Sequence, residues 1–250
     1  MQLVLLTALG VGGATVVGAL LGFCTKGMSH KFSDIIMGFA AGVMLSAAVI
    51  GLVMPSLEYG TKPMALVVTI IGIFCGAFCL NILDKVVPHL HGIAGMDVGE
   101  NSGQLDKVLL FVVAIGIHNL PEGVAAGVSF GTDNVADALL VAGGIALQNI
   151  PEGMVIIAPL LAIGVKPMRT FLIAAATGVI EVIGTLVGFF AVNISVMVLP
   201  FALAFAGGTM IYVVSDEMIP ETHAHGNEMG ATYALLVGFC VMIGMDYLLG

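Results

Sequence analysis

The sequence predicts an all-α integral membrane protein, with eight transmembrane helices in one polytopic domain spanning residues 1–250. Three observations predict this class. The mean hydropathy is +1.14, and 59% of the residues are hydrophobic while 9% are charged, which excludes an ordinary soluble domain. Eight stretches reach the roughly 20 predominantly apolar residues that a transmembrane helix requires. No segment shows the short alternation of apolar and polar residues that a membrane β-barrel needs.

The eight stretches are joined mostly by short connections, so they account for nearly the whole chain. The first stretch lacks a basic segment before it and a small-residue cleavage site after it. We therefore expect it to be retained as a helix and not removed as a signal peptide. In chain order the predicted spans are Leu3–Phe23, Phe32–Leu57, Pro63–Leu83, Val108–Phe130, Val135–Leu161, Thr170–Val192, Val196–Val214 and Ala231–Leu249.

Small side chains within the spans predict a tightly packed bundle. Glycines at a spacing of four residues allow helices to approach closely, and they form the pairs Gly38/Gly42, Gly72/Gly76, Gly123/Gly127 and Gly184/Gly188. The cysteines also lie within or at the edges of spans. Cys75 and Cys79 are four residues apart on one helix face, and small apolar packing residues explain them better than a soft-metal pair. The cysteines of the chain are Cys24, Cys75, Cys79 and Cys240, and no CxxC motif is present.

The distribution of basic residues predicts the orientation in the membrane. If the N-terminus is outside, the inner loops carry six of the seven basic residues, and the outer loops carry only Lys62. This asymmetry follows the positive-inside rule, so both termini are predicted to lie outside. The inner basic residues are Lys26, Lys31, Lys85, Lys107, Lys166 and Arg169. No basic patch indicates nucleic acid, and no phosphate-binding GxxxxGK[ST] loop indicates a nucleotide.

One phrase occurs twice, in the fourth and fifth spans. It reads HNLPEG at His118–Gly123 and QNIPEG at Gln148–Gly153. Each copy places a carboxylate and an amide where the surroundings are hydrocarbon, and ionisable groups there normally mark an ion pathway or a binding site. The offset of thirty residues corresponds to one helix and a short turn, so the two copies can face each other at a similar depth.

The spacing within each phrase predicts a shared site. His118 and Glu122 are four residues apart, as are Gln148 and Glu152, so each pair lies on one helix face. Two such helices packed antiparallel would bring together two carboxylates, one imidazole and three amides. Carboxylate and imidazole ligands suit Zn²⁺, Fe²⁺ or Mn²⁺ better than Mg²⁺. The phrases therefore predict a metal site in the middle of a membrane.

Other polar residues extend this prediction. Glu181 lies near the middle of the sixth span without a neighbouring charge in the sequence, and the shared metal is its expected partner. The end of the seventh span carries an acidic and imidazole-rich cluster on the predicted cytoplasmic side, and a cation exit route and a solvated loop fit it about equally. The cluster comprises Asp216, Glu217, Glu221, His223 and His225. His89 and His91, in the longest inner loop, are better explained as solvated residues than as a metal-capture pair.

These residues give the chain a family resemblance. It resembles the ZIP (Zrt/Irt-like protein) divalent-metal transporters, in particular the compact prokaryotic GufA and zinc-uptake branch. The paired PEG phrases carry the resemblance, supported by GFAAGVML at Gly38–Leu45 and YVVSDEMIPETH at Tyr212–His223. The resemblance implies eight helices with both termini outside, and spans one to three and six to eight forming inverted repeats around a central pair of spans four and five. It also implies metal uptake into the cytoplasm.

The resemblance further implies two adjacent metal positions that share the motif glutamates. The first would use His118, Glu122, Gln148 and Glu152, and the second would use Asn119, Glu122, Asn149, Glu152 and Glu181. This chain departs from some relatives by carrying Gln148 where histidine is frequent and Asn149 where aspartate can occur. Both departures weaken the ligands or reduce their charge, so the number of bound metals and the preferred metal stay open.

We predict a secondary transporter that moves divalent metal cations into the cytoplasm by alternating access. Zinc is the expected cargo, and Fe²⁺, Mn²⁺ and Cd²⁺ are alternatives. A bacterial inner membrane is the expected location, and a homodimer is compatible with the sequence. A passive metal channel and a regulatory metal receptor are alternatives. An intramembrane metalloenzyme is a weaker alternative, because HExxH is absent and neither motif span supplies the Glu-x-x-His pair of a diiron bundle. We therefore expect no enzyme activity and no catalytic cofactor.

Overall fold

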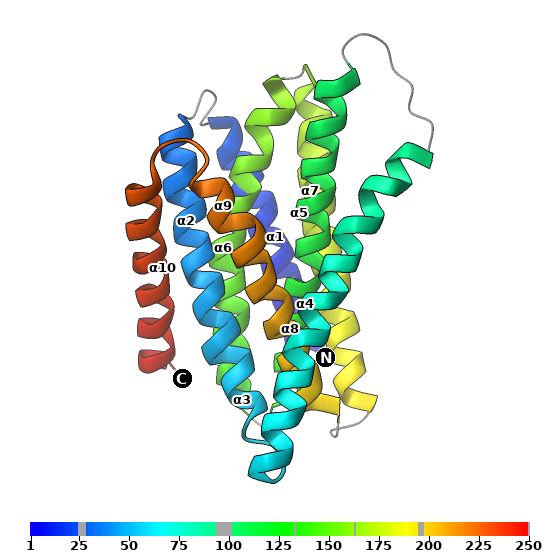
Figure 1. The fold of residues 1–250 in the computed structure, drawn as a ribbon, viewed down its shortest axis with the longest axis vertical. Coiled ribbons are helices and arrows are strands. Elements are labelled where there is room, and N and C mark those ends of the chain that lie inside the picture. The colour runs from blue at the N-terminus through cyan, green and yellow to red at the C-terminus, as the bar shows by residue number, and fades with distance from the viewer. Residues whose placement is uncertain (25–28, 94–101, 133, 163, 195–197, 250) are drawn as a thin grey trace.

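The computed structural model describes residues 1–24, 29–93, 102–132, 134–162, 164–194 and 198–249, which form helices and turns and contain no strand. The side chains of residues 84, 86–93, 102–115 and 193–194 lie outside the described part. The described residues form eight helical rods that run side by side (Figure 1). Six of the rods are single helices: α1 (Gln2–Cys24), α4 (Lys62–Ile93), α5 (Ser102–Ser129), α6 (Val135–Ala162), α7 (Pro167–Ile194) and α10 (Glu228–Leu249).

The other two rods are composite, and both change their helical winding before a proline. The first consists of α2 (His30–Ser46), the π-helical segment η1 (Ala47–Val53) and α3 (Met54–Ser56), which contains Pro55. The second consists of α8 (Leu199–Val213), η3 (Val214–Met218) and α9 (Ile219–Thr222), which contains Pro220. A proline cannot donate to the preceding turn, and a π-helical turn is a common way for a helix to absorb such a break, often at functional sites.

Seven of the rods are long and apolar enough to cross a membrane among the residues searched. The remaining rod is α5, of which residues 102–115 have side chains outside the described part. The predicted end of the seventh span at Val214 is wrong, because the helix continues through η3 and α9 to Thr222. Helix α4 likewise extends through His89 and His91, which the sequence places in a loop, although their side chains lie outside the described part.

Both chain ends lie toward the lower end of the bundle in Figure 1, and the α9–α10 turn lies at the upper end. The short turns are made possible by glycines in the left-handed region, where a side chain would strain the backbone. These are Gly60 between α3 and α4, Gly164 between α6 and α7, and Gly226 between α9 and α10, with φ values of 84°, 84° and 77°.

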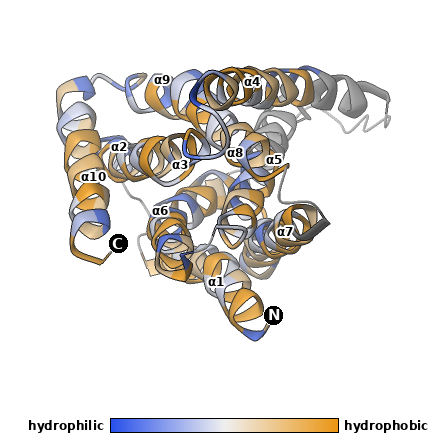
Figure 2. Ribbon diagram, turned by 90° about the horizontal axis from the view of Figure 1, so that it is seen from below, coloured by the Kyte–Doolittle hydropathy of each residue, from blue (hydrophilic) through white to orange (hydrophobic). Residues whose placement is uncertain are grey.

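The helices pack in two groups that differ in their partners. Helices α1, α5, α6 and α7 contact one another extensively, whereas α2 packs mainly on α10 and α4 mainly on α8. The view from below separates α1, α6 and α7 from α4 and α10 (Figure 2). The two groups meet chiefly where α2 contacts α6 and where α5 contacts α8.

The glycine pairs that the sequence singled out all lie at these helix contacts. A Cβ added at Gly38 would lie 2.5 Å from the carbonyl oxygen of Ala231 on α10, and one at Gly184 would lie 2.5 Å from that of Leu120 on α5. Gly42, Gly76, Gly123, Gly127 and Gly188 similarly face backbone carbonyls of a neighbouring helix, and Gly72 faces Ala204. The prediction of a bundle packed through small residues is therefore confirmed.

Large apolar side chains cover the outside of the bundle. Phe74 on α4 and Leu172 on α7 are 71% and 58% exposed, which fits a lipid-facing surface. All four cysteines are exposed and free. The interpretation of Cys75 and Cys79 as packing residues is therefore wrong, because both are exposed on the outside of α4 and do not lie between helices.

Candidate metal site

The two motif phrases lie on α5 and α6 and turn their polar side chains into the protein. Glu122 and Gln148 are fully buried, and His118 and Glu152 are each 7% exposed. Glu122 interacts electrostatically with both Glu152 and Glu181. The fold therefore brings three carboxylates from three helices close together, the two whose proximity the motif spacing predicts and Glu181. Carboxylates gathered in a protein interior need a cation, hydrogen-bond donors or protonation to offset their charge.

The carboxylate of Glu122 is buried, and neither of its oxygens has a hydrogen-bond donor among the described residues. The side chain of Gln148 lies beside it, but the Gln148 amide atoms also lack hydrogen-bond geometry. Buried polar groups are normally paired, so these atoms are suited to hold a ligand that brings positive charge.

Glu181 has the opposite surroundings, because donors from three other helices surround its carboxylate. Thr15 Oγ1 on α1 donates to Oε1 at 2.6 Å, and Asn149 Nδ2 on α6 donates to Oε2 at 2.5 Å. Asn119 Nδ2 on α5 also donates to Oε1. A fourth bond runs from Asn149 Nδ2 to the carbonyl oxygen of Val11 on α1 at 3.2 Å, so the Asn149 amide also contacts α1. This network ties together all four helices of the first group.

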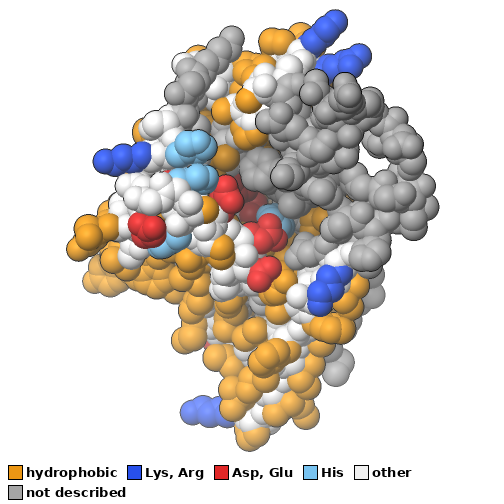
Figure 3. Space-filling model, turned by 45° about the horizontal axis from the view of Figure 1, so that its top comes forward, with side chains coloured by type: hydrophobic (Ala, Val, Ile, Leu, Met, Phe, Trp, Pro, Cys, Tyr) orange, Lys and Arg blue, Asp and Glu red, His pale blue; other side chains and the backbone are white. Residues whose placement is uncertain are grey.

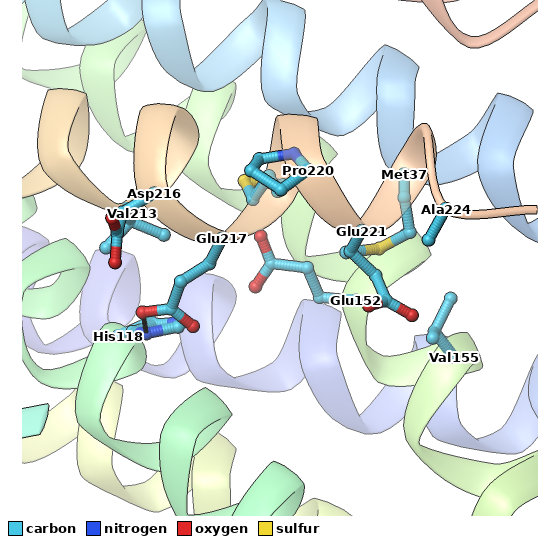
Figure 4. A pocket seen from close by; sticks show the side chains of 11 residues that line it. Met37, His118, Glu152, Val155, Val213, Asp216, Glu217, Pro220, Glu221 and Ala224 are labelled. Carbon is cyan, nitrogen blue, oxygen red and sulfur yellow. Dashed lines mark ion pairs between the residues drawn. The ribbon is translucent and has the colours of Figure 1, made fainter. Parts of the chain in front are cut away.

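On the other side of the motif, a cavity of about 470 Å³ reaches His118 and Glu152. Figure 3 shows acidic and histidine side chains gathered in a hollow on the face that carries the upper end of the bundle, above a broad hydrophobic zone. Figure 4 shows Glu152 and His118 pointing toward Glu217 of η3, with Glu221 of α9 beside Glu152. The lining residues are Met37, His118, Glu152, Val155, Val213, Asp216, Glu217, Met218, Pro220, Glu221 and Ala224.

An ion pair links the motif to the cluster at the end of the seventh rod. His118 Nε2 lies 2.5 Å from Glu217 Oε1 (Figure 4). With His118 turned to Glu217 and Glu181 engaged by amides, no three histidine, cysteine, aspartate or glutamate side chains in the described part are grouped so that they could hold a metal. The metal role of the predicted residues stays a prediction, and it requires His118 to move or amide oxygens to serve as ligands.

The structure divides the predicted exit residues into two sets. Asp216, Glu217 and Glu221 line the cavity, and they lie on helical segments and not in a solvated loop. Neither His223 nor His225 is among the described residues that line it. His223 Nδ1 contacts the Ile219 carbonyl oxygen at 2.8 Å. The ring of His225 stacks on His30 and contacts Asp34 Oδ1 at 3.0 Å.

Two polar residues of this region were missed from the sequence. Thr15 is fully buried and contacts Glu181, and Asp34 is 3% exposed and holds His225. Thr15 has a weak signal, because it is a polar residue within an otherwise apolar span. A threonine in a helix commonly bonds to its own backbone, so its partner on α7 follows only from the packing of α1. Asp34 likewise meets a residue 191 positions away.

Comparisons with known proteins place this chain among metal transporters. A sequence model of the family described as ZIP Zinc transporter matches residues 89–246, which include both motif phrases. Zinc transporter GufA of Myxococcus xanthus is 38% identical over 251 residues, covering 98% of each chain.

Two further relatives show the same coverage of nearly the whole chain. Zinc transporter ZIPB of Bordetella bronchiseptica is 38% identical over 249 residues, covering 95% of this chain and 78% of the relative. Zinc transporter ZupT of Chlorobaculum parvum is 34% identical over 247 residues, covering 92% and 91%. The similarity therefore includes all the helices that form the site.

Proposed function

Because the chain belongs to the ZIP family of zinc transporters, as its paired motifs predict, we propose that it carries divalent transition-metal cations into the cytoplasm. Members of this family are multi-pass membrane transporters and not enzymes. The observation that carries the proposal is the Glu122 carboxylate, which is buried without a hydrogen bond beside two further carboxylates. A divalent cation provides the positive charge that this arrangement lacks.

The proposed transport site combines the residues that the sequence singled out. It consists of His118, Asn119, Glu122, Gln148, Asn149, Glu152 and Glu181. Zinc is the proposed main cargo, since imidazole and carboxylate ligands suit it and the similar proteins are named zinc transporters. Fe²⁺, Mn²⁺ and Cd²⁺ share enough of this ligand chemistry to be tested as competitors.

The proposed orientation has both termini outside and the cavity open to the cytoplasm. The α9–α10 turn lies at the upper end of the bundle in Figure 1, and its residue Ala224 lines the cavity. By the positive-inside rule this end is cytoplasmic, because six of the seven basic residues precede or follow spans there. A metal would then leave past Glu217, Asp216 and Glu221. We propose a bacterial inner membrane as the location and retain the homodimer as a prediction.

The pairing of the helices supports the proposed inverted repeat. In such a repeat, α1, α2 and α4 correspond to α7, α8 and α10, and α5 corresponds to α6. The contact between α1 and α6 then matches the contact between α7 and α5. The contact of α2 with α10 matches that of α8 with α4 by the same exchange. The π-helical segments η1 and η3, each followed by a proline, occupy corresponding places.

The division of the helices into two groups supports alternating access. The polar network around Glu181 unites α1, α5, α6 and α7, while their contacts with the other group are confined mainly to α2 with α6 and α5 with α8. We therefore propose that the first group, which carries the metal ligands, moves against the second group. Breaking the pair between His118 and Glu217 is part of this step, because the two residues lie on different groups.

Uptake of zinc into proteoliposomes that contain the purified protein tests this function. We expect saturable uptake that competing metals reduce, measured with and without an imposed pH gradient. Uptake that rises linearly with zinc concentration would indicate a passive channel. Zinc binding without any flux would indicate a metal receptor and would contradict the proposal.

A further inference from the structure

The surroundings of Glu181 indicate a role other than direct metal binding. Its two carboxylate oxygens accept hydrogen bonds from Thr15, Asn119 and Asn149, which come from three different helices. The side chain is fully buried. Three side-chain donors are therefore directed at Glu181, whereas neither Glu122 oxygen accepts a hydrogen bond among the described residues.

These bonds determine which way the two asparagine amides point. In both bonds the asparagine donates through its Nδ2 nitrogen and a carboxylate oxygen of Glu181 accepts. Since the amide is planar and its oxygen lies on the other side, each Oδ1 atom is directed away from Glu181. Both Oδ1 atoms, of Asn119 and Asn149, are buried and accept no hydrogen bond among the described residues.

The asparagine oxygens without a hydrogen-bond partner in the described part of the chain lie in the same motif phrases as the motif glutamates. Asn119 and Glu122 are three residues apart on α5 and lean toward the same helix face. With both Glu122 oxygens and the two amide oxygens, four buried acceptors have no donor. Oxygen atoms without donors on two helices in contact are candidate ligands for a cation, and amide and carboxylate oxygens suit divalent ions.

We propose that Glu181 is a positioning residue, which orients the Asn119 and Asn149 amides so that their oxygens bind the metal together with Glu122. Thr15 in turn fixes Glu181 from α1. This inference rests on the proposed metal site, and it revises the expectation that Glu181 is itself a ligand. It resembles the way in which hydrogen-bonded partners outside a metal's coordination shell orient the ligands in other proteins.

Thr15 offers the most direct test, because its hydroxyl bonds to Glu181 and Thr15→Val keeps its shape. We expect Thr15→Val to weaken zinc binding about 10-fold, near the lower end of the range for residues that orient metal ligands. Thr15→Ser keeps the hydroxyl and should restore the affinity. The measurement is the zinc dissociation constant of the purified full-length protein, by competition with a chromophoric chelator, with thermal unfolding to verify folding.

Thr185→Val is the matched control for this experiment. Thr185 is also fully buried, but its hydroxyl bonds to the backbone carbonyl of Glu181 and not to its carboxylate. We expect wild-type zinc affinity for this variant. Wild-type affinity in Thr15→Val would overturn the proposal, and so would an equal loss in Thr185→Val, because that would indicate a general effect of removing a buried hydroxyl.

Infrared difference spectra distinguish a positioning carboxylate from a coordinating one. Zinc should shift carboxylate stretches of the wild-type protein, and Glu122→Gln should remove the part of that shift which Glu122 contributes. Glu181→Gln should weaken binding about 10- to 100-fold, yet at saturating zinc it should retain every metal-shifted carboxylate band. Loss of such a band in Glu181→Gln would identify Glu181 as a ligand. A wild-type protein that binds no divalent metal would instead refute the proposed function itself.

Discussion

The two sides of the motif differ in how their charged groups are satisfied. On the closed side, formed by Thr15, Asn119, Asn149 and Glu181, donors of the protein satisfy the carboxylate. The cavity side has no such network among the described residues. It has one ion pair, between His118 and Glu217, and its side chains line the cavity. It is formed by His118, Glu152, Asp216, Glu217 and Glu221. A network of this kind fixes geometry, whereas a single ion pair beside a cavity can exchange partners. A site that must bind an ion and then release it needs both.

Glu122 lies between the two sides and should be the most sensitive position. Glu122→Gln keeps the shape but removes the charge that balances the cation, so we expect zinc uptake by proteoliposomes to fall by about 100-fold or more. Glu58→Gln, at an exposed carboxylate between α3 and α4, is the control and should transport normally. Substantial uptake by Glu122→Gln would remove this residue from the site.

The closed side depends on the contact between α1 and α7, which Gly12→Ala disturbs. A Cβ at Gly12 would collide with the carbonyl of Gly178 and lie 2.9 Å from Val182 Cγ2. Overpacking of this kind costs about 1–3 kcal/mol, so we expect a lower unfolding temperature in detergent and weaker zinc binding. At the neighbouring Gly13 a Cβ would meet nothing within 4 Å. Gly13→Ala should therefore leave both quantities unchanged, and equal effects of the two changes would contradict this account of the closed side.

The cavity side should tolerate change better, as Glu217→Gln would show. This variant removes the ion pair with His118, in which Glu217 is 29% exposed. Pairs near the surface contribute about 0.2–1 kcal/mol, and Glu217 also lines the proposed exit route, so we expect the maximal uptake rate to change by no more than a few-fold while half-saturation for external zinc changes little. Glu228→Gln, at the exposed start of α10, is the control. A loss as complete as that of Glu122→Gln would mean that Glu217 is essential to the site.

The smallest effect is expected beyond the cavity, at His225. Because its partner is Asp34 and it does not line the cavity in the described part of the chain, His225→Gln should change zinc uptake by less than about 2-fold, as for other partly exposed pairs. Initial uptake rates measure this. A large loss of uptake in a normally folded variant would return His225 to the exit route.

The rods and their contacts could be predicted well from the sequence, because both depend on local patterns. Apolar length marks the spans, and the glycine pair at Gly184 and Gly188 marks a close contact with α5. The end of the seventh rod could not be predicted in this way. Pro220 normally signals a helix boundary, but the wider turn of η3 absorbs it and carries Asp216 and Glu217 to the cavity.

Within the site, the proximity of the motif carboxylates could be predicted but the hydrogen-bond partners could not. The spacing of Glu122 and Glu152 indicates facing carboxylates without any knowledge of the fold. The direction of the Asn149 amide, by contrast, depends on Glu181 from α7 and on the Val11 carbonyl oxygen from α1. Such partners are set by packing between distant segments, which no local pattern records.

The central claim is that the motif carboxylates hold the transported metal. The most direct measurement is radioactive zinc uptake by proteoliposomes containing the double variant Glu122→Ala/Glu152→Ala, reconstituted at the same density as the wild-type protein. Because this variant lacks both motif carboxylates, we expect no uptake above that of protein-free vesicles, although the protein inserts and remains folded. Zinc accumulation at the wild-type rate would contradict the proposed transport site.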